Sequence, residues 1–181
     1  MKIKLTLIAA FGLLFTSATK AQTPETPPDP KIFKDTANCR KFESKVKEYV
    51  EWTIKTPCVN KDVTLWKKVD DFIWAWTNGS SDVTVTIGKV IEPILEDKKD
   101  KGGYELLIAY MGGIAVYELE NRKDKDEVNI EYAGLKAMLE MVKINGNLFT
   151  NAKAVKKYQG MDDNALKKYV ADCLTDDKKG K

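Results

Sequence analysis

The sequence predicts an all-α fold, a single-domain bundle of six to seven helices with a tight central antiparallel helix pair. Two observations predict it. Apolar residues recur at helical spacing along almost the whole chain, and the segments with this spacing are joined by short polar turns. In addition, the stretch from Tyr104 to Tyr117 contains a single charged residue, Glu105, which is typical of a helix buried on most sides.

Residues 1–21 have the pattern of a secretory signal peptide. Lys2 and Lys4 precede an apolar run from Leu5 to Phe15, and small residues lead to a cleavage site after Ala21. The apolar run is shorter than the roughly 20 residues that a membrane-spanning helix needs. We therefore expect an exported, soluble mature chain, periplasmic or secreted, without a transmembrane segment.

Removal of this leader also changes the charge balance. The full chain has 30 basic and 27 acidic residues, and three of its lysines lie in the leader, so the mature chain carries 27 of each. A surface that binds nucleic acid needs a sustained excess of basic residues to neutralise phosphates. The sequence therefore predicts no nucleic-acid partner.

The domain boundaries follow from composition. Residues 22–31 hold four of the six prolines and predict a Pro-rich flexible linker. The helical domain is expected over residues 32–174. Residues 175–181 are charged and contain a glycine, which favours a disordered tail.

Polar caps and stops divide the domain into helices. We expect a first helix from the cap at Asp35 to the stop at Pro57, and a second from the cap at Asp62 to Gly79. The next region, residues 83–97, alternates apolar residues with threonines and then contains a proline. It predicts a short extended segment followed by a short or kinked helix.

Four further helices complete the expected bundle, over about 103–121, 127–145, 151–160 and 162–174. The first of these contains Gly112 and Gly113, and each glycine costs a helix about 1 kcal/mol relative to alanine. A short connection between the first two predicts an antiparallel pair in which Gly113 lies beside Gly134. Small residues on facing helices permit close packing that offsets the glycine cost. A backbone cleft for a ligand, or a local π-bulge, is the alternative.

The chain has three cysteines, Cys39, Cys58 and Cys173. Cys39 and Cys58 flank one expected helix and would lie roughly 25 Å apart, whereas a disulfide needs Cα atoms within about 7 Å. Cys39 and Cys173 both share a helix face with apolar residues, so we favour a bridge between the first and last helices. A bridge between Cys58 and Cys173, or three free or buried thiols, are the alternatives.

Few residues suggest chemistry. The chain has no histidine, which removes the usual nucleophilic triads and ordinary zinc sites, and it has no phosphate-binding or dinucleotide motif. We therefore expect no cofactor, no metal site and no catalytic residue. The acid pairs Asp70–Asp71 and Asp162–Asp163 leave a carboxylate hydrolase open, although adjacent residues point apart on a helix.

The tryptophans of the second helix differ in their position. Trp66 and Trp76 share its apolar stripe, and Trp74 lies about 80° around the helix from Trp66. Packing at the edge of the core is one interpretation. The other is an interface residue, because exposed aromatic side chains are enriched where proteins bind partners.

Several segments together resemble a known group of proteins. The leader ends in "ATKAQ", one helix ends in "WTIKTP", another reads "YMGGIAVYELEN", and "AGLKAML" is followed by "NGN". With these features the mature chain resembles uncharacterised small exported helical proteins of Bacteroidota. This resemblance implies an exported helical fold and no specific activity.

These observations lead to two functional expectations. The first is an exported soluble helical module, non-enzymatic, that binds a protein partner or a small apolar ligand in the cell envelope. The second is an envelope hydrolase that acts through a carboxylate pair. A dry apolar patch around Trp74 would favour the first, and two facing acids with raised pKa values in a cleft would favour the second.

Overall fold

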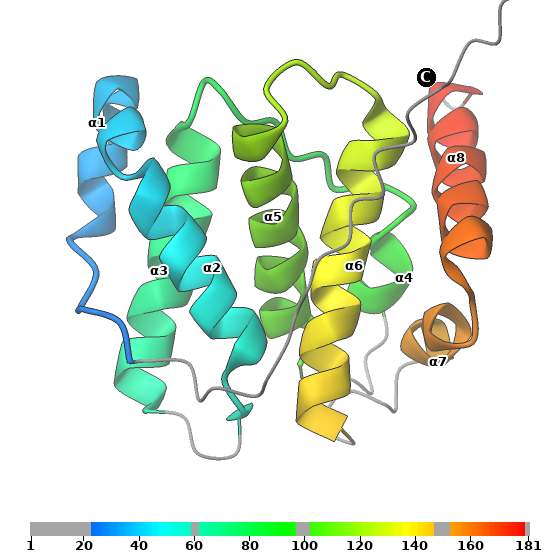
Figure 1. The fold of residues 1–181 in the computed structure, drawn as a ribbon, viewed down its shortest axis with the longest axis horizontal. Coiled ribbons are helices and arrows are strands. Elements are labelled where there is room, and N and C mark those ends of the chain that lie inside the picture. Colours follow the sequence, from blue (N-terminus) through cyan, green and yellow to red (C-terminus); the bar gives the residue numbers. More distant parts are fainter. Residues whose placement is uncertain (1–22, 59–61, 97–101, 147–152, 180–181) are drawn as a thin grey trace, which may run out of the picture.

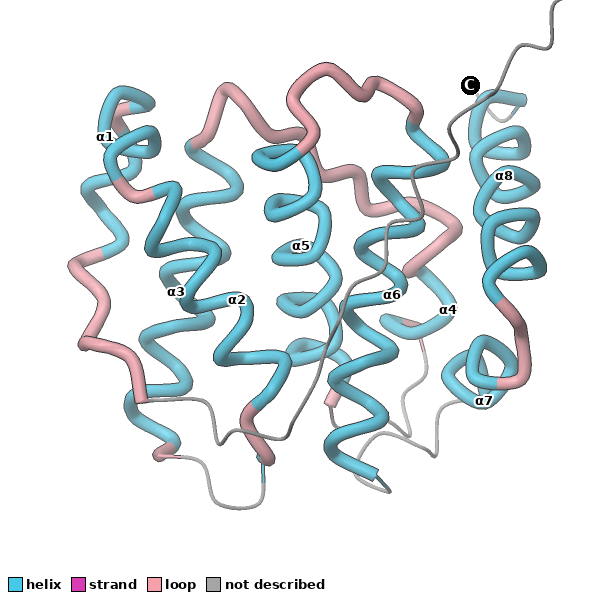
Figure 2. Tube along the Cα trace, viewed as in Figure 1, coloured by secondary structure: helices cyan, strands magenta, loops and turns pink. Residues whose placement is uncertain are grey.

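A computed structural model describes residues 23–58, 62–96, 102–146 and 153–179 of the chain. Regular structure in these residues is helical, with no strand (Figure 2). The predicted all-α class is therefore confirmed. The predicted signal peptide, residues 1–21, lies outside the described residues.

The described helices form two layers with one helix at each end (Figure 1). Helices α2 and α6 make the near layer, α3, α4 and α5 lie behind them, and α1 and α8 lie at opposite ends. The elements are η1 (Pro30–Lys34, a 3-10 helix), α1 (Thr36–Lys41), α2 (Glu43–Lys55), α3 (Val63–Gly79), α4 (Glu92–Leu95), α5 (Gly103–Glu120), α6 (Glu127–Asn145), α7 (Lys153–Gln159) and α8 (Asp163–Lys179).

Aspartate side chains cap several of these helices. Asp35 accepts a hydrogen bond from the amide of Ala37 at the start of α1, and Asp62 accepts from the second and third amides of α3. At the start of α6, Asp126 accepts from the amide of Val128 over 3.0 Å. Each carboxylate satisfies amides that have no partner within the helix, so the predicted caps at Asp35 and Asp62 are confirmed.

The first predicted helix is divided in two. Helix α1 ends at Lys41 and α2 begins at Glu43, with Phe42 between them at φ −109° and ψ 9°. No glycine or proline marks the break. The Phe42 ring instead packs edge-to-face on Phe33 and Phe72, with centroids 5.5 Å and 6.1 Å away. Packing between distant segments therefore interrupts a continuous helical pattern.

A crossover segment, residues 80–91, passes behind the central helices from α3 to α4 (Figure 1). Val83 is buried and Thr84 is exposed, as the predicted alternation requires, but Ile87 is also exposed. The amide of Thr84 donates to Oε2 of Glu118 in α5 over 2.9 Å. Pro93 lies in the first turn of α4, where its missing amide donor costs nothing, so α4 is short rather than kinked.

The segment predicted to be a flexible linker lies against the domain in its described residues. Residues 23–29 form no helix, yet Pro24 and Pro27 are buried against the domain. Glu25 forms an ion pair with Lys45 of α2 over 3.2 Å. Burial of proline rings and an ion pair hold the segment in place, which composition did not indicate.

The predicted disordered tail also needs correction, because α8 continues through Lys179. The residues after Leu174 contain no proline, and their only glycine is Gly180. No helix-breaking residue therefore interrupts α8 before its end at Lys179. The last helix is thus longer than its apolar stripe.

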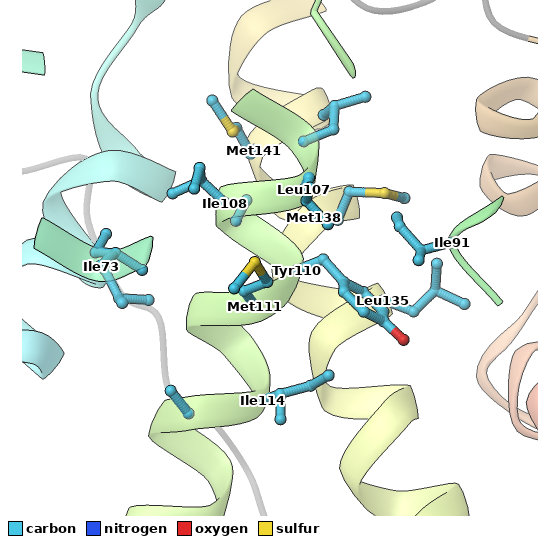
Figure 3. Close-up of a cluster of buried hydrophobic side chains, with 14 of the residues drawn as sticks. Ile73, Ile91, Leu107, Ile108, Tyr110, Met111, Ile114, Leu135, Met138 and Met141 are labelled. Atoms are coloured by element: carbon cyan, nitrogen blue, oxygen red, sulfur yellow. The ribbon is translucent and has the colours of Figure 1, made fainter. Parts of the chain in front are cut away.

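The core centres on α5. Twelve of its 18 residues are buried, and its neighbours α2, α3, α4 and α6 contribute the side chains that surround it. Figure 3 shows Met111 and Ile114 of α5 between Ile73 of α3 and Leu135 of α6. This arrangement confirms that a helix without a polar face lies inside the bundle.

Candidate functional site

The glycines of α5 are explained by packing. A Cβ atom on Gly113 would collide with the Cβ of Ala137 and would lie 3.1 Å from the Cα of Gly134, both in α6. A Cβ on Gly134 would in turn lie 2.9 Å from the carbonyl oxygen of Tyr110. Both helices therefore need glycine where they approach most closely, as predicted.

Gly112 has the same role on another face of α5. A Cβ there would lie 2.7 Å from a methyl group of Val50 in α2. The two adjacent glycines thus allow two different helices to pack closely on α5, α6 at Gly113 and α2 at Gly112. Since protein atoms fill the space beside both glycines, this part of α5 is not an open backbone cleft for a ligand.

The predicted Cys39–Cys173 disulfide is wrong. Neither cysteine forms a disulfide, and α1 and α8 lie at opposite ends of the molecule (Figure 1). Cys39 lies beside α3, where the indole nitrogen of Trp76 donates to the Cys39 carbonyl over 2.8 Å. Burial raises the pKa of the Cys39 thiol. The prediction failed because an apolar helix face shows that a cysteine is buried, but not which helix covers it.

The two acid pairs do not form a facing carboxylate site. Asp70 is buried in α3, whereas Asp71 forms an ion pair with Lys67 over 2.8 Å. Asp162 caps α8 by accepting from the amide of Ala165. Adjacent residues on these helices have separate partners, as the helical geometry implies.

Asp163 further illustrates this point. It pairs with Lys136 of α6 over 2.8 Å, and this hydrogen bond, followed by one from Tyr132, holds the pKa of its carboxyl below the usual value. The pKa values of Asp82 and Asp124 are also lowered, mainly by hydrogen bonds from Arg40 and Tyr117. A general acid would need a carboxyl with a raised pKa instead.

Two open hollows lie on the described surface, and charged residues contribute to the lining of both. One, of about 360 Å³, lies over the turn that joins α5 to α6, residues 119–124. The other, of about 380 Å³, lies between the start of α6 and the end of α8. Small apolar ligands favour enclosed apolar pockets with a few polar groups, and neither hollow has that character.

Three exposed apolar side chains come from α3, α4 and α5. They are Trp74, Leu95 and Tyr104, with exposed fractions of 39%, 38% and 47%, and we call them together the aromatic patch. Gly103, next to Tyr104, packs against the backbone of Ile94, next to Leu95. The sequence indicated Trp74 only.

Tyr104 and Trp74 are linked through α3. Asp70 and Asp71 act on the Tyr104 hydroxyl electrostatically, and Trp74 lies one turn after them. The pKa of Tyr104 is raised, first by burial of the ring and then by the negative charges of Asp70, Asp71 and Glu105. The aromatic patch therefore lies beside acidic residues of α3 and α5, of which Asp71 is paired with Lys67.

Sequence reasoning missed Tyr104 because it begins the most apolar helix of the chain. A residue in the first turn of a buried helix can lie beyond the ends of the surrounding helices. It is then exposed, although it lies on the same helix face as buried apolar residues. Its place directly after Gly102 and Gly103 was the available signal.

Among the described residues, no helix combines the length and apolar character needed to cross a membrane. Comparison of the chain with protein-family models, with curated proteins and with solved structures gives no match.

Proposed function

We propose that this protein is an exported helical module that binds a partner protein through the aromatic patch. The observation that carries the proposal is the exposure of Trp74 and Tyr104 beside the same two aspartates. Aromatic residues are enriched at protein interfaces, and large rings supply much of the binding energy there. The leader-like pattern of residues 1–21 supports export.

The charges around the patch favour a basic partner segment. Glu105, Asp70 and Asp71 all raise the pKa of Tyr104, so a cation near its hydroxyl is stabilised. A lysine or arginine placed over Trp74 or Tyr104 would add a cation–π contact, worth about 0.5–2 kcal/mol. The chemistry of the partner is thus an apolar segment that presents a basic side chain.

The other expectations gain less support. A small apolar ligand would need a dry pocket, and the two hollows carry charged linings. A carboxylate hydrolase would need a facing acid pair with a raised pKa, and the resolved carboxyl shifts are downward.

Site-specific photocrosslinking in intact cells tests the proposed interface. A photoreactive residue replaces Trp74 or Tyr104 in the full chain, and a third variant carries it at Lys143, an exposed position on α6. We expect one shared crosslinked protein at the first two positions and none at Lys143. Adding Asp71→Lys should weaken that crosslink, because the substitution reverses a charge beside the patch.

Two results would contradict the proposal. Equal crosslinking at all three positions would show random collisions, and an unchanged yield with Asp71→Lys would remove the electrostatic part. Export is tested separately by fractionation and N-terminal sequencing. The expected mature chain begins at Gln22, and a cytoplasmic chain beginning at Met1 would refute export.

A further inference from the structure

The segment before η1 places two prolines on the domain at a spacing of three residues. Pro24 and Pro27 are buried, whereas Glu25 and Thr26 between them are exposed. A polyproline II helix has three residues per turn, so residues i and i+3 lie on the same edge. Asp29, at φ −59° and ψ 123°, has a backbone conformation close to this helix.

An ion pair aligns the segment with α2. Oε2 of Glu25 lies 3.2 Å from Nζ of Lys45, which also binds Glu48 over 2.9 Å. Hydrogen bonds from Lys45 to Glu48 and then to Glu25 raise the pKa of Lys45. Tyr49 lies one helical turn after Lys45 in α2; burial raises its pKa, and the charge of Glu25 adds to that shift.

Tyr49 belongs to a cluster of aromatic rings at this end of the molecule. Its ring packs against Phe72 with a centroid distance of 4.8 Å, and Phe72 packs against Phe33 at 4.9 Å. The described start of the chain runs up this end toward η1 (Figure 1). Surfaces that bind polyproline II segments are typically lined by aromatic rings, which contact prolines three residues apart.

We propose that the surface beside Lys45 and Tyr49 is a recognition site for P-E-x-P segments of partner proteins. Residues 23–29 of this chain occupy the site as a built-in competitor. The prolines supply apolar burial, and Lys45 selects the acidic residue that follows the first proline. This site lies apart from the aromatic patch and does not rest on the function proposed for it.

The covalent connection between residues 23–29 and the domain controls how often the site is occupied. A segment joined to its site by a short connection has an effective concentration in the millimolar range. A free peptide of the same sequence must compete with it, so the intact chain binds that peptide weakly. Release of the built-in segment should expose the site.

The test uses a fluorescent peptide with the sequence of residues 22–30 and measures its binding by anisotropy. Its targets are the full mature chain and the same chain carrying Pro24→Ala and Pro27→Ala. We expect the double variant to bind the peptide at least about tenfold more tightly than the unchanged chain. A peptide carrying Thr26→Ala is the matched control and should bind equally well, because Thr26 is exposed.

Charge reversal tests the role of Lys45. In the double variant, Lys45→Glu should weaken the peptide at least several-fold, and a peptide with Glu25→Lys should recover the loss. Recovery also shows that the Lys45→Glu chain is folded, and circular dichroism checks every variant. Peptide binding that is no tighter in the double variant, or charge reversal without recovery, overturns the proposal. Dimerisation of the unchanged chain that is lost in the double variant, without peptide binding, would instead assign the segment to a second copy.

Discussion

The α5–α6 pair and the α7–α8 pair are held in the bundle in different ways. Helices α5 and α6 touch through backbone and small side chains, with Gly113 facing Gly134. Helix α8 instead buries a narrow stripe, Leu166, Val170 and Cys173, and keeps charged residues on its other faces.

Hydrogen bonds add to this second type of contact. The Tyr158 hydroxyl of α7 donates to the carbonyl of Val90 over 3.1 Å, and it lies 2.9 Å from the Tyr169 hydroxyl of α8. Ring burial, followed by interactions with Cys173 and Tyr158, raises the pKa of Tyr169. The central pair therefore depends on shape, and the outer pair depends on a stripe and a few polar contacts.

The largest expected effect tests the shape of the central pair. Gly113→Leu should destabilise the protein by about 3 kcal/mol, because the added side chain meets the α6 backbone. The midpoint of thermal unfolding should fall by roughly 10 °C. Gly160→Ala, in the turn between α7 and α8, is the control, since its new Cβ would meet only ordinary contacts at 3.6 Å and beyond. Equal melting of wild type and Gly113→Leu would show that the close approach is wrong.

A smaller effect on the free energy of unfolding is expected at two buried tyrosines, and it should differ between them. Tyr158→Phe should cost about 1 kcal/mol, because it removes the hydroxyl contacts to Val90 and Tyr169. Tyr110→Phe should leave stability unchanged or raise it by about 1 kcal/mol, because the Tyr110 hydroxyl is buried and has no hydrogen-bond partner among the described residues. Urea unfolding measures both variants, and a larger loss for Tyr110→Phe would reverse the assigned roles.

The smallest expected effect depends on pH and concerns the outer pair. The Lys136 hydrogen bond lowers the folded-state pKa of Asp163 below its usual value of 3.8. Its contribution is therefore present above about pH 4 and is lost as the pH falls through the folded-state pKa. Asp163→Asn should cost a few tenths of a kcal/mol at pH 6, as exposed ion pairs do, and less at pH 2.5. A difference from wild type that is as large at pH 2.5 as at pH 6 would contradict this origin.

Local signals in the sequence were sufficient for the central part of the fold. The starts of α1 and α3 follow from Asp35 and Asp62, since a carboxylate satisfies helix amides only one or two residues away. The Gly113–Gly134 approach followed from a short turn, which limits two helices to one antiparallel register. Trp74 was correctly singled out as lying away from the core stripe.

Other features depend on segments that are far apart in the chain, and only the tertiary structure decided them. Phe42 interrupts a helix because two distant rings pack on it, and Pro24 and Pro27 are buried because a surface on the domain accepts them. Periodicity states which side of a helix is buried but not which neighbour covers it, so Cys39 and Cys173 were paired wrongly. By itself, the sequence determined the helices, their caps and the central glycine contact, because these depend on nearby residues. Neighbours, ring clusters and exposed patches depend on how the helices assemble.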